Sequence, residues 1–149
     1  MCRTDSPPTQ IIGTQVWAGG ESAAHDYLRS NPDVHSVVCL RRTLPDWWTT
    51  LPKEMHSQIT FYHWPTPDIT DLHMGEAILA VTIDLLPNIA PPVLVFCLNG
   101  RNRTGVLAGL LRFQVTGDIQ LAVQEYGRRA SLDFRPDEVN LLQRLCFKQ

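Results

Sequence analysis

The stretch that decides the fold runs from Val93 to Gly109 and reads VLVFCLNGRNRTGVLAG. Its first part is short and apolar, which predicts a buried strand over Pro92–Cys97. Its last part begins a helix that Gly117 ends and whose apolar residues share one face: Val106, Leu107, Leu110, Leu111 and Phe113. The loop between these elements therefore joins the carboxyl end of a strand to the amino end of a helix.

This loop has the features of an anion-binding site. Gly100 lets the backbone approach an anion closely, and the helix N-terminus adds the positive end of its dipole. Arg103 can hold a tetrahedral anion with its planar guanidinium. The positive surroundings would favour the thiolate of Cys97, the nucleophilic form, and Thr104 can donate a hydrogen bond to it. We therefore expect Cys97, Arg103 and Thr104 to be catalytic, with the anion bound by Arg103 and by the loop residues Leu98, Asn99, Gly100, Arg101 and Asn102.

These residues resemble the signature of the cysteine-dependent protein tyrosine phosphatase superfamily, Cys-x5-Arg-Ser/Thr between a strand and a helix. The resemblance covers most of the chain, and the compact size looks like the dual-specificity branch with its atypical bacterial, plant and fungal members. Low-molecular-weight phosphatases and arsenate reductases carry such a loop near the N-terminus, and a rhodanese lacks support from the Arg-Thr-Gly ending. Three further segments match in the expected order: Trp17-Ala18-Gly19-Gly20, Val38-Cys39-Leu40-Arg41 and Trp64-Pro65-Thr66-Pro67-Asp68.

The resemblance implies a metal-independent phosphomonoesterase that uses no cofactor. It implies that Cys97 attacks phosphorus to form a phosphocysteine, while Arg103 and the loop amides stabilise the other phosphate oxygens. An aspartate protonates the leaving oxygen and then activates water. Asp68 and Asp71 precede Cys97 by 29 and 26 residues, and Asp68 is the preferred acid. Both aspartates also fit an N-terminal cap of the next helix, so Asp71, or neither residue, stays open.

Two departures from the family pattern bear on the acid and on the rate. The family usually has His immediately before the cysteine, where this chain has Phe96, and we expect a less stabilised thiolate and slower turnover. In phytase-like relatives the acid lies just upstream of Trp-Pro-Thr-Pro, but the corresponding residue here is Phe61, with His63 as a remote substitute.

The loop also bears on the substrate, because Arg101 adds a cation beyond the signature. A second cation favours a highly anionic substrate, and the expected substrate is a phosphorylated protein or an inositol phosphate or phosphoinositide. The alternative is a catalytically weak pseudophosphatase that binds phosphorylated ligands. A thiol-redox or sulfur-transfer role would need a partner for Cys97, and the spacing of the cysteines shows none nearby.

Composition narrows the class of protein. With 149 residues, 44% hydrophobic residues and a net charge of −2, the chain is long enough for one domain and is neither disordered nor basic enough for nucleic acid. No apolar run approaches the length of a membrane span, and no cysteine–histidine cluster has zinc spacing. The start of the chain lacks a hydrophobic signal core, so we expect a cytoplasmic protein. We expect a monomer by default.

The remaining pattern predicts an α/β fold: a single-domain, protein tyrosine phosphatase-like fold over 1–149, with a small mixed central sheet flanked by helices. Residues 1–9 are expected to form a flexible lead-in, and 43–57 an irregular segment. Arg128 and Arg129 are expected at an exposed helix end, and Cys39 and Cys146 in the core. Strands are expected over Ile11–Trp17, Val34–Leu40, Ile59–Trp64 and Pro92–Cys97, with helices after Ser22, over Thr70–Leu86, after the loop, after Asp118 and from Pro136.

Overall fold

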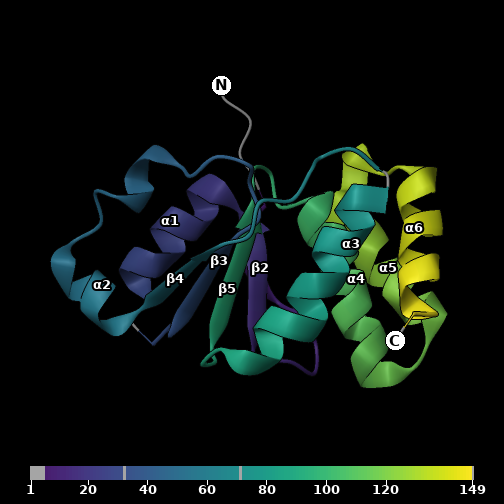
Figure 1. The fold of residues 1–149 in the computed structure, drawn as a ribbon, viewed down its shortest axis with the longest axis horizontal. Coiled ribbons are helices and arrows are strands. Elements are labelled where there is room, and N and C mark those ends of the chain that lie inside the picture. Colours follow the sequence, from purple (N-terminus) through teal and green to yellow (C-terminus); the bar gives the residue numbers. More distant parts are fainter. Residues whose placement is uncertain (1–5, 32, 71, 149) are drawn as a thin grey trace.

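The computed structural model describes residues 6–31, 33–70 and 72–148, and within them the chain forms one mixed sheet flanked by helices (Figure 1). The sheet has the order β1-β2-β5-β3-β4, in which only β1 runs antiparallel to its neighbour. Its strands are β1 (Thr9–Gln10), β2 (Val16–Gly20), β3 (Ser36–Cys39), β4 (Thr60–His63) and β5 (Val93–Cys97). The α-helices are α1 (Glu21–Ser30), α2 (Lys53–Gln58), α3 (Leu72–Ala80), α4 (Arg103–Thr116), α5 (Ile119–Ala130) and α6 (Pro136–Cys146). The predicted α/β fold with a small mixed sheet is confirmed.

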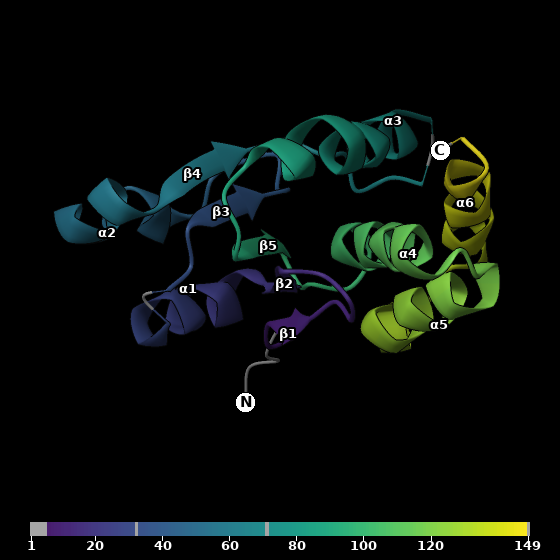
Figure 2. The ribbon, with the colours of Figure 1, turned by 90° about the horizontal axis from the view of Figure 1, so that it is seen from below.

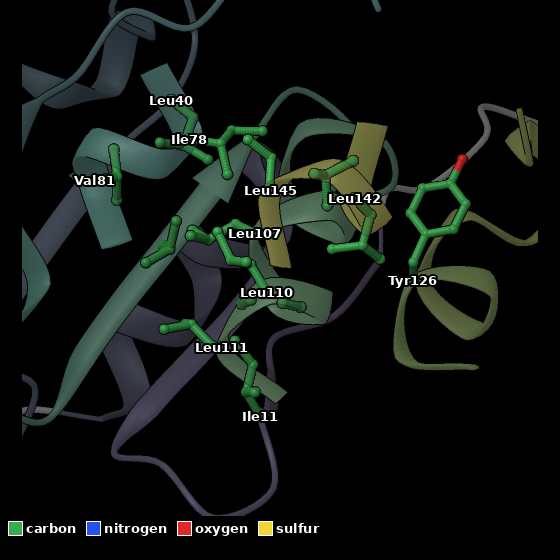
Figure 3. Close-up of a cluster of buried hydrophobic side chains, with 14 of the residues drawn as sticks. Ile11, Leu40, Ile78, Val81, Leu107, Leu110, Leu111, Tyr126, Leu142 and Leu145 are labelled. Atoms are coloured by element: carbon green, nitrogen blue, oxygen red, sulfur yellow. The ribbon is translucent and has the colours of Figure 1, made fainter. Parts of the chain in front are cut away.

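The helices divide between the two faces of the sheet, and both views place α1 on one side and α4, α5 and α6 on the other (Figures 1 and 2). Side chains alternate accordingly along the central strand: Leu94 and Phe96 join the core under α1, whereas Val95 and Cys97 join the core under α4. Figure 3 shows the larger core, to which α4 contributes Leu107 and Leu110 and α6 contributes Leu142 and Leu145. Cys97 thus lies at the carboxyl end of the central strand, on the face of the sheet that α4 covers.

The topology places a crevice at the carboxyl end of β5. This strand lies between the parallel strands β2 and β3. The chain leaves β2 into α1 on one face of the sheet and leaves β5 into α4 on the other (Figure 2). Connections that depart to opposite faces from neighbouring strands open a crevice, where ligands bind in sheets of this kind. Cys97 ends β5 at that point.

Several boundaries differ from those expected. Of the strand expected over Ile11–Trp17, only Val16 and Trp17 are in a strand, the start of β2, because the chain turns at Gly13, whose φ is 84°. This turn joins β1 to β2 as a hairpin. The segment 43–57 holds a 3-10 turn at Asp46–Trp48 and the short helix α2, and the helix expected over Thr70–Leu86 leaves the α-form after α3 for a π-turn at Val81–Leu85. The end of α4 at Gly117, with φ of 68°, and the cap of α5 by Asp118 are as predicted.

The N-terminal segment from Ser6 is more ordered than the flexible lead-in expected over 1–9. The Ser6 N–H donates to the carbonyl of Asn99, and the Ser6 carbonyl accepts from the N–H of Gly20. The segment continues into β1, and residues 1–5 lie outside the described part of the chain. Residues 6–9 are therefore part of the folded structure, and Ser6 contacts the loop that follows β5.

Arg129 was expected at an exposed helix end and is instead buried, with a side-chain exposure of 4%. Its guanidinium donates to the carbonyls of Ala18 and Thr9 and to the carboxylate of Glu125. Arg128 also pairs with Glu125 but stays exposed. These bonds fasten α5 to the β1–β2 hairpin.

The Glu125 carboxylate is the charged centre of this contact. Burial acts to raise the pKa of Glu125, but the hydrogen bonds from Arg128 and Arg129 outweigh burial and lower the pKa below its ordinary value of 4.5. A carboxylate whose pKa is lower in the folded state than in the unfolded state contributes stability above the unfolded pKa. That contribution is lost as the pH falls through the folded pKa.

We predict that Glu125→Gln lowers the free energy of unfolding at neutral pH by about 2 kcal/mol or more, because Arg129 is left buried without its counter-charge. The free energy of unfolding of the variant should also fall less than that of the wild type between neutral pH and pH values below 4.5. Urea titrations at a series of pH values measure both effects. Parallel pH dependences in the two proteins would contradict the assignment.

Candidate active site

Cys97 and Thr104 meet at the junction of strand and helix. The Thr104 hydroxyl lies 2.9 Å from the Cys97 Sγ and donates to it, and both residues are buried. Cys97 ends β5 and Thr104 is in the first turn of α4, so the helix N-terminus faces the sulfur with its positive end. A thiolate at this position would receive both a hydrogen bond and a favourable field.

In the loop over residues 98–102, here the 98–102 loop, four carbonyl groups accept backbone hydrogen bonds. The Leu98 carbonyl accepts from the N–H of Glu21, and the Asn99 carbonyl accepts from the N–H of Ser6. At the helix start, the carbonyls of Arg101 and Asn102 accept from Gly105 and Val106. In a trans peptide the N–H points opposite to the carbonyl of the same unit. The N–H groups that follow these carbonyls, on residues 99, 100, 102 and 103, therefore point away from the groups that the carbonyls contact.

Gly100 is the point of closest approach between this loop and the sheet. Its φ is 73°, and a Cβ on it would lie 2.4 Å from the carbonyl carbon of Gly19 and 2.5 Å from the nitrogen of Gly20. On the other side of the same strand end, a Cβ on Gly19 would lie 2.8 Å from the nitrogen of Pro8. The paired glycines thus let the end of β2 fit between the N-terminal segment and the 98–102 loop.

Arg103 is positioned by backbone carbonyls from two other segments. Its guanidinium donates to the carbonyls of Leu40, at 3.5 Å, and Thr66, at 3.4 Å. The side chain is 8% exposed. Because a guanidinium has five N–H donors, these two bonds fix its place and leave further donors for an anion. Leu40 follows β3, Thr66 follows β4, and the loop that leads to Arg103 follows β5. The carboxyl ends of three strands therefore converge at Arg103.

A small cavity, partly open to solvent, brings most of the expected site residues together, while Gly100 and Thr104 do not line it. It is lined by Asp68, Cys97, Leu98, Asn99, Arg101, Asn102 and Arg103. The Asp68 carboxylate is half-exposed, and its Oδ1 lies 3.8 Å from the Nε of Arg103 and 3.8 Å from an Nη of Arg135. Asp68 therefore stands at the mouth of the cavity that holds the thiol. Asp71, the other candidate acid, lies outside the described residues.

The other two positions considered for an acid point elsewhere. The His63 Nε2 bonds to the carbonyl of Arg41 at 2.7 Å. The Phe61 ring packs edge-on against Trp48, with ring centroids 4.9 Å apart. Neither residue lines the cavity.

The second cation of the loop has a partner. An Nη of Arg101 lies 3.0 Å from the carboxylate of Asp133, which precedes α6. Next to it, the Asn102 side-chain amide donates to the carbonyl of Asp133 and to the carboxylate of Glu138. Arg101 lines the cavity, but Asp133 offsets part of its charge.

Phe96, at the position where the family resembled by the sequence usually has His, faces away from the 98–102 loop. Its ring lies in the aromatic cluster under α1, with centroids 5.4 Å from Trp47 and 6.1 Å from Trp48. The side chain is fully buried and has no polar atom to support the loop. The outward carbonyl bonds to Glu21 and Ser6 hold the loop by other means.

Two further described cysteines are core residues. Burial raises the pKa of the Cys39 thiol to about 11 and that of Cys146 to about 11, so both are protonated near neutral pH. Among the described residues, no group of three or more His, Cys, Asp or Glu side chains could hold a metal ion. Nor does any helix of the described chain combine the length and apolar character needed to cross a membrane.

Comparison with solved structures decides the fold. The core catalytic domain of the PP-IP phosphatase SIW14 from S. cerevisiae, in complex with citrate, superposes with a TM-score of 0.74 over 96% of this chain and 87% of that one, at 18% identity. The chain has the fold of the cysteine-dependent protein tyrosine phosphatases. Human DUSP28 matches with a TM-score of 0.65 over 99% and 98% of the two chains, at 16% identity, and the active form of Tk-PTP with 0.62 over 95% and 97%, at 19% identity. No family model and no curated protein matches the sequence.

Within this phosphatase fold, sequence reasoning missed the residues that support the loop from a distance. Ser6 and Glu138 are the main ones, since each bonds to the loop from a remote part of the chain. The signal for Ser6 was hidden in a proline-rich start that is typical of a loose segment. Glu138 lies in the first turn of α6, which is a common place for glutamate, so its position in the sequence gives no sign of the contact.

We predict that Gly100→Ala removes phosphate binding and lowers the free energy of unfolding by more than about 2 kcal/mol, because both the positive φ and the contact with β2 oppose a Cβ. Gly117→Ala is the matched control: Gly117 has φ of 68°, and nothing lies within 4 Å of its Cβ position. The control should lose only about 1 kcal/mol and keep phosphate binding. Chemical denaturation and phosphate titration measure the pair, and equal losses in both variants would show that the close approach at Gly100 is unimportant.

Proposed function

We propose that this chain is a phosphatase that hydrolyses phosphomonoesters through a phosphocysteine on Cys97. The observation that carries the proposal is the single cavity in which the Cys97 thiol, hydrogen-bonded by Thr104, faces the Arg103 guanidinium and the Asp68 carboxylate. Nucleophile, anion clamp and acid are the three groups that this reaction requires. The shared fold with known phosphatases supports the same chemistry.

In the proposed first step, the Cys97 thiolate attacks phosphorus and the bond from phosphorus to the leaving oxygen breaks. Arg103 and the N–H groups of the 98–102 loop bind the three other oxygens, on which charge accumulates. Asp68 gives its proton to the leaving oxygen. In the second step water attacks phosphorus, Asp68 takes the proton, and the sulfur–phosphorus bond breaks with Thr104 donating to the departing thiolate.

The proposed substrate is a phosphorylated protein or an inositol phosphate or phosphoinositide. The SIW14 domain is a PP-IP phosphatase, which favours the second of these classes for this chain. Arg101 at the cavity supports an anionic substrate, while its pairing with Asp133 limits the charge available to it. A panel of phosphotyrosine peptide, phosphoserine peptide, phosphoinositide and inositol polyphosphate separates the two classes.

We predict that Cys97→Ser abolishes turnover on every member of this panel while the fold and phosphate binding persist, because the serine hydroxyl is not ionised at neutral pH. Arg103→Lys should also lose nearly all activity, since an ammonium cannot reproduce the planar fork. Steady-state assays with circular dichroism as the folding control measure both. Phosphate binding by a wild type that turns over no substrate would instead favour a phosphate-binding module, and Phe96 in place of His is the feature that fits that alternative.

We predict that Asp68→Asn slows hydrolysis of an alkyl phosphate far more than that of an activated aryl phosphate, because only the poor leaving group needs a proton. General acid help is worth roughly 100- to 10,000-fold. Asp118→Asn is the control, since Asp118 caps α5 and does not line the cavity. The same assays on Asp71→Asn decide between the two aspartates, and an equal loss on both substrates for Asp68→Asn would remove it from the acid role.

A further inference from the structure

Glu138 is a fully buried carboxylate in the first turn of α6, and it holds four hydrogen-bond donors. Its Oε1 accepts from the Tyr126 hydroxyl at 2.5 Å and from the Asn102 side-chain amide at 2.9 Å. Its Oε2 accepts from the Thr70 hydroxyl and from an Nη of Arg135, each at 3.4 Å. A buried carboxylate is stable only when its oxygens are satisfied in this way.

The Tyr126 hydroxyl donates a hydrogen bond to Glu138 in this cluster. Burial raises the pKa of Tyr126, and the hydrogen bond to Glu138 raises it further, so the hydroxyl stays protonated. The same oxygen accepts from the backbone N–H of Arg135 at 2.9 Å. In Figure 3 the Tyr126 hydroxyl points away from the labelled aliphatic side chains. The cluster is therefore a polar contact at the border of the core.

The donors come from the segments that the proposed chemistry must hold together. Asn102 immediately precedes Arg103 in the 98–102 loop, and Thr70 lies two residues after Asp68. Arg135 contacts the carboxylates of both Glu138 and Asp68, at 3.4 Å and 3.8 Å. Glu138 thus touches the anion-binding loop directly and the acid-bearing segment by two routes.

From this arrangement we propose that Glu138 is a positioning residue, which fixes Asp68 relative to the Cys97 cavity by joining the acid-bearing segment to the 98–102 loop. The inference rests on the proposed phosphatase function and adds a residue to it. Glu138 does not line the cavity and does not touch substrate. Its effect passes through Thr70 and Arg135 to Asp68, and through Asn102 to the loop.

A purely structural role would be to hold α6 against α5 through Tyr126, and it makes different predictions. Loss of that contact alone would lower stability without changing how the rate depends on the leaving group. Glu125 offers the matched case: it is also buried, also on this pair of helices and also paired with arginine, but its partners lead to β1 and β2. Comparing the two Glu→Gln variants separates positioning from general stability.

The test uses Glu138→Gln and Glu125→Gln in the full chain, assayed well below their unfolding temperatures. We expect Glu138→Gln to slow hydrolysis of an alkyl phosphate about tenfold more than that of an activated aryl phosphate, a part of the full effect of a general acid. Glu125→Gln should slow both equally or not at all. Equal effects of Glu138→Gln on the two substrates would overturn the proposal.

A second measurement does not depend on turnover. Amide hydrogen exchange over residues 66–70 should be faster in Glu138→Gln than in the wild type and unchanged in Glu125→Gln. Thr70→Val, which removes a single donor, should shift exchange in the same direction and serves if Glu138→Gln does not fold. Unchanged exchange in 66–70 would refute the positioning role. A wild type without Cys97-dependent turnover would refute the proposed function and leave the exchange result to judge Glu138.

Discussion

The structure depends on how closely the 98–102 loop approaches the end of β2. Gly100 lies against the backbone of Gly19 and Gly20 at a distance that admits no Cβ, and its positive φ turns the chain there. This contact lets Glu21 bond to the loop carbonyl of Leu98, while Ser6 bonds to that of Asn99. Because these carbonyls accept from Glu21 and Ser6, the N–H groups of the same peptides point the other way, as the proposed anion-binding role requires. The conformation of the loop beside Cys97 thus depends on its neighbours as much as on its own sequence.

Charged side chains line the other side of the cavity. Arg103 is fixed by the carbonyls of Leu40 and Thr66, and Asp68 stands between Arg103 and Arg135. Such a cluster is costly to bury unless each charge is paired, and here each arginine has an acidic or carbonyl partner. Most of these partners lie outside the signature segment: Leu40 follows β3, Thr66 and Asp68 follow β4, and Glu138 is in α6. Pairing with such groups lets two arginines stand beside the cavity of a protein whose net charge is −2.

The sequence was most informative where local pattern and function coincide. The run Val93–Gly109 predicted the strand, the loop, the helix and the Thr104–Cys97 contact, because all of these depend on residues close together in the chain. It failed where tertiary contacts decide. Arg129 was expected in solvent because it is near the end of a helix, yet it is buried and donates to the carbonyls of Ala18 and Thr9. The turn at Gly13 lies within a segment whose pattern predicts a strand. Glu138 contacts Asn102 across 36 residues of chain, a separation that no local pattern spans.

The proposed reaction requires Cys97 to form a covalent bond to phosphorus. The most direct measurement is to mix the wild-type protein with an activated aryl phosphate, quench with acid within the first turnovers, and map the peptides by mass spectrometry. We predict a phosphoryl group on the peptide that contains Cys97, absent when inorganic vanadate occupies the cavity before mixing. Turnover that proceeds with no phosphoryl group on Cys97, or with one on another residue, would contradict it.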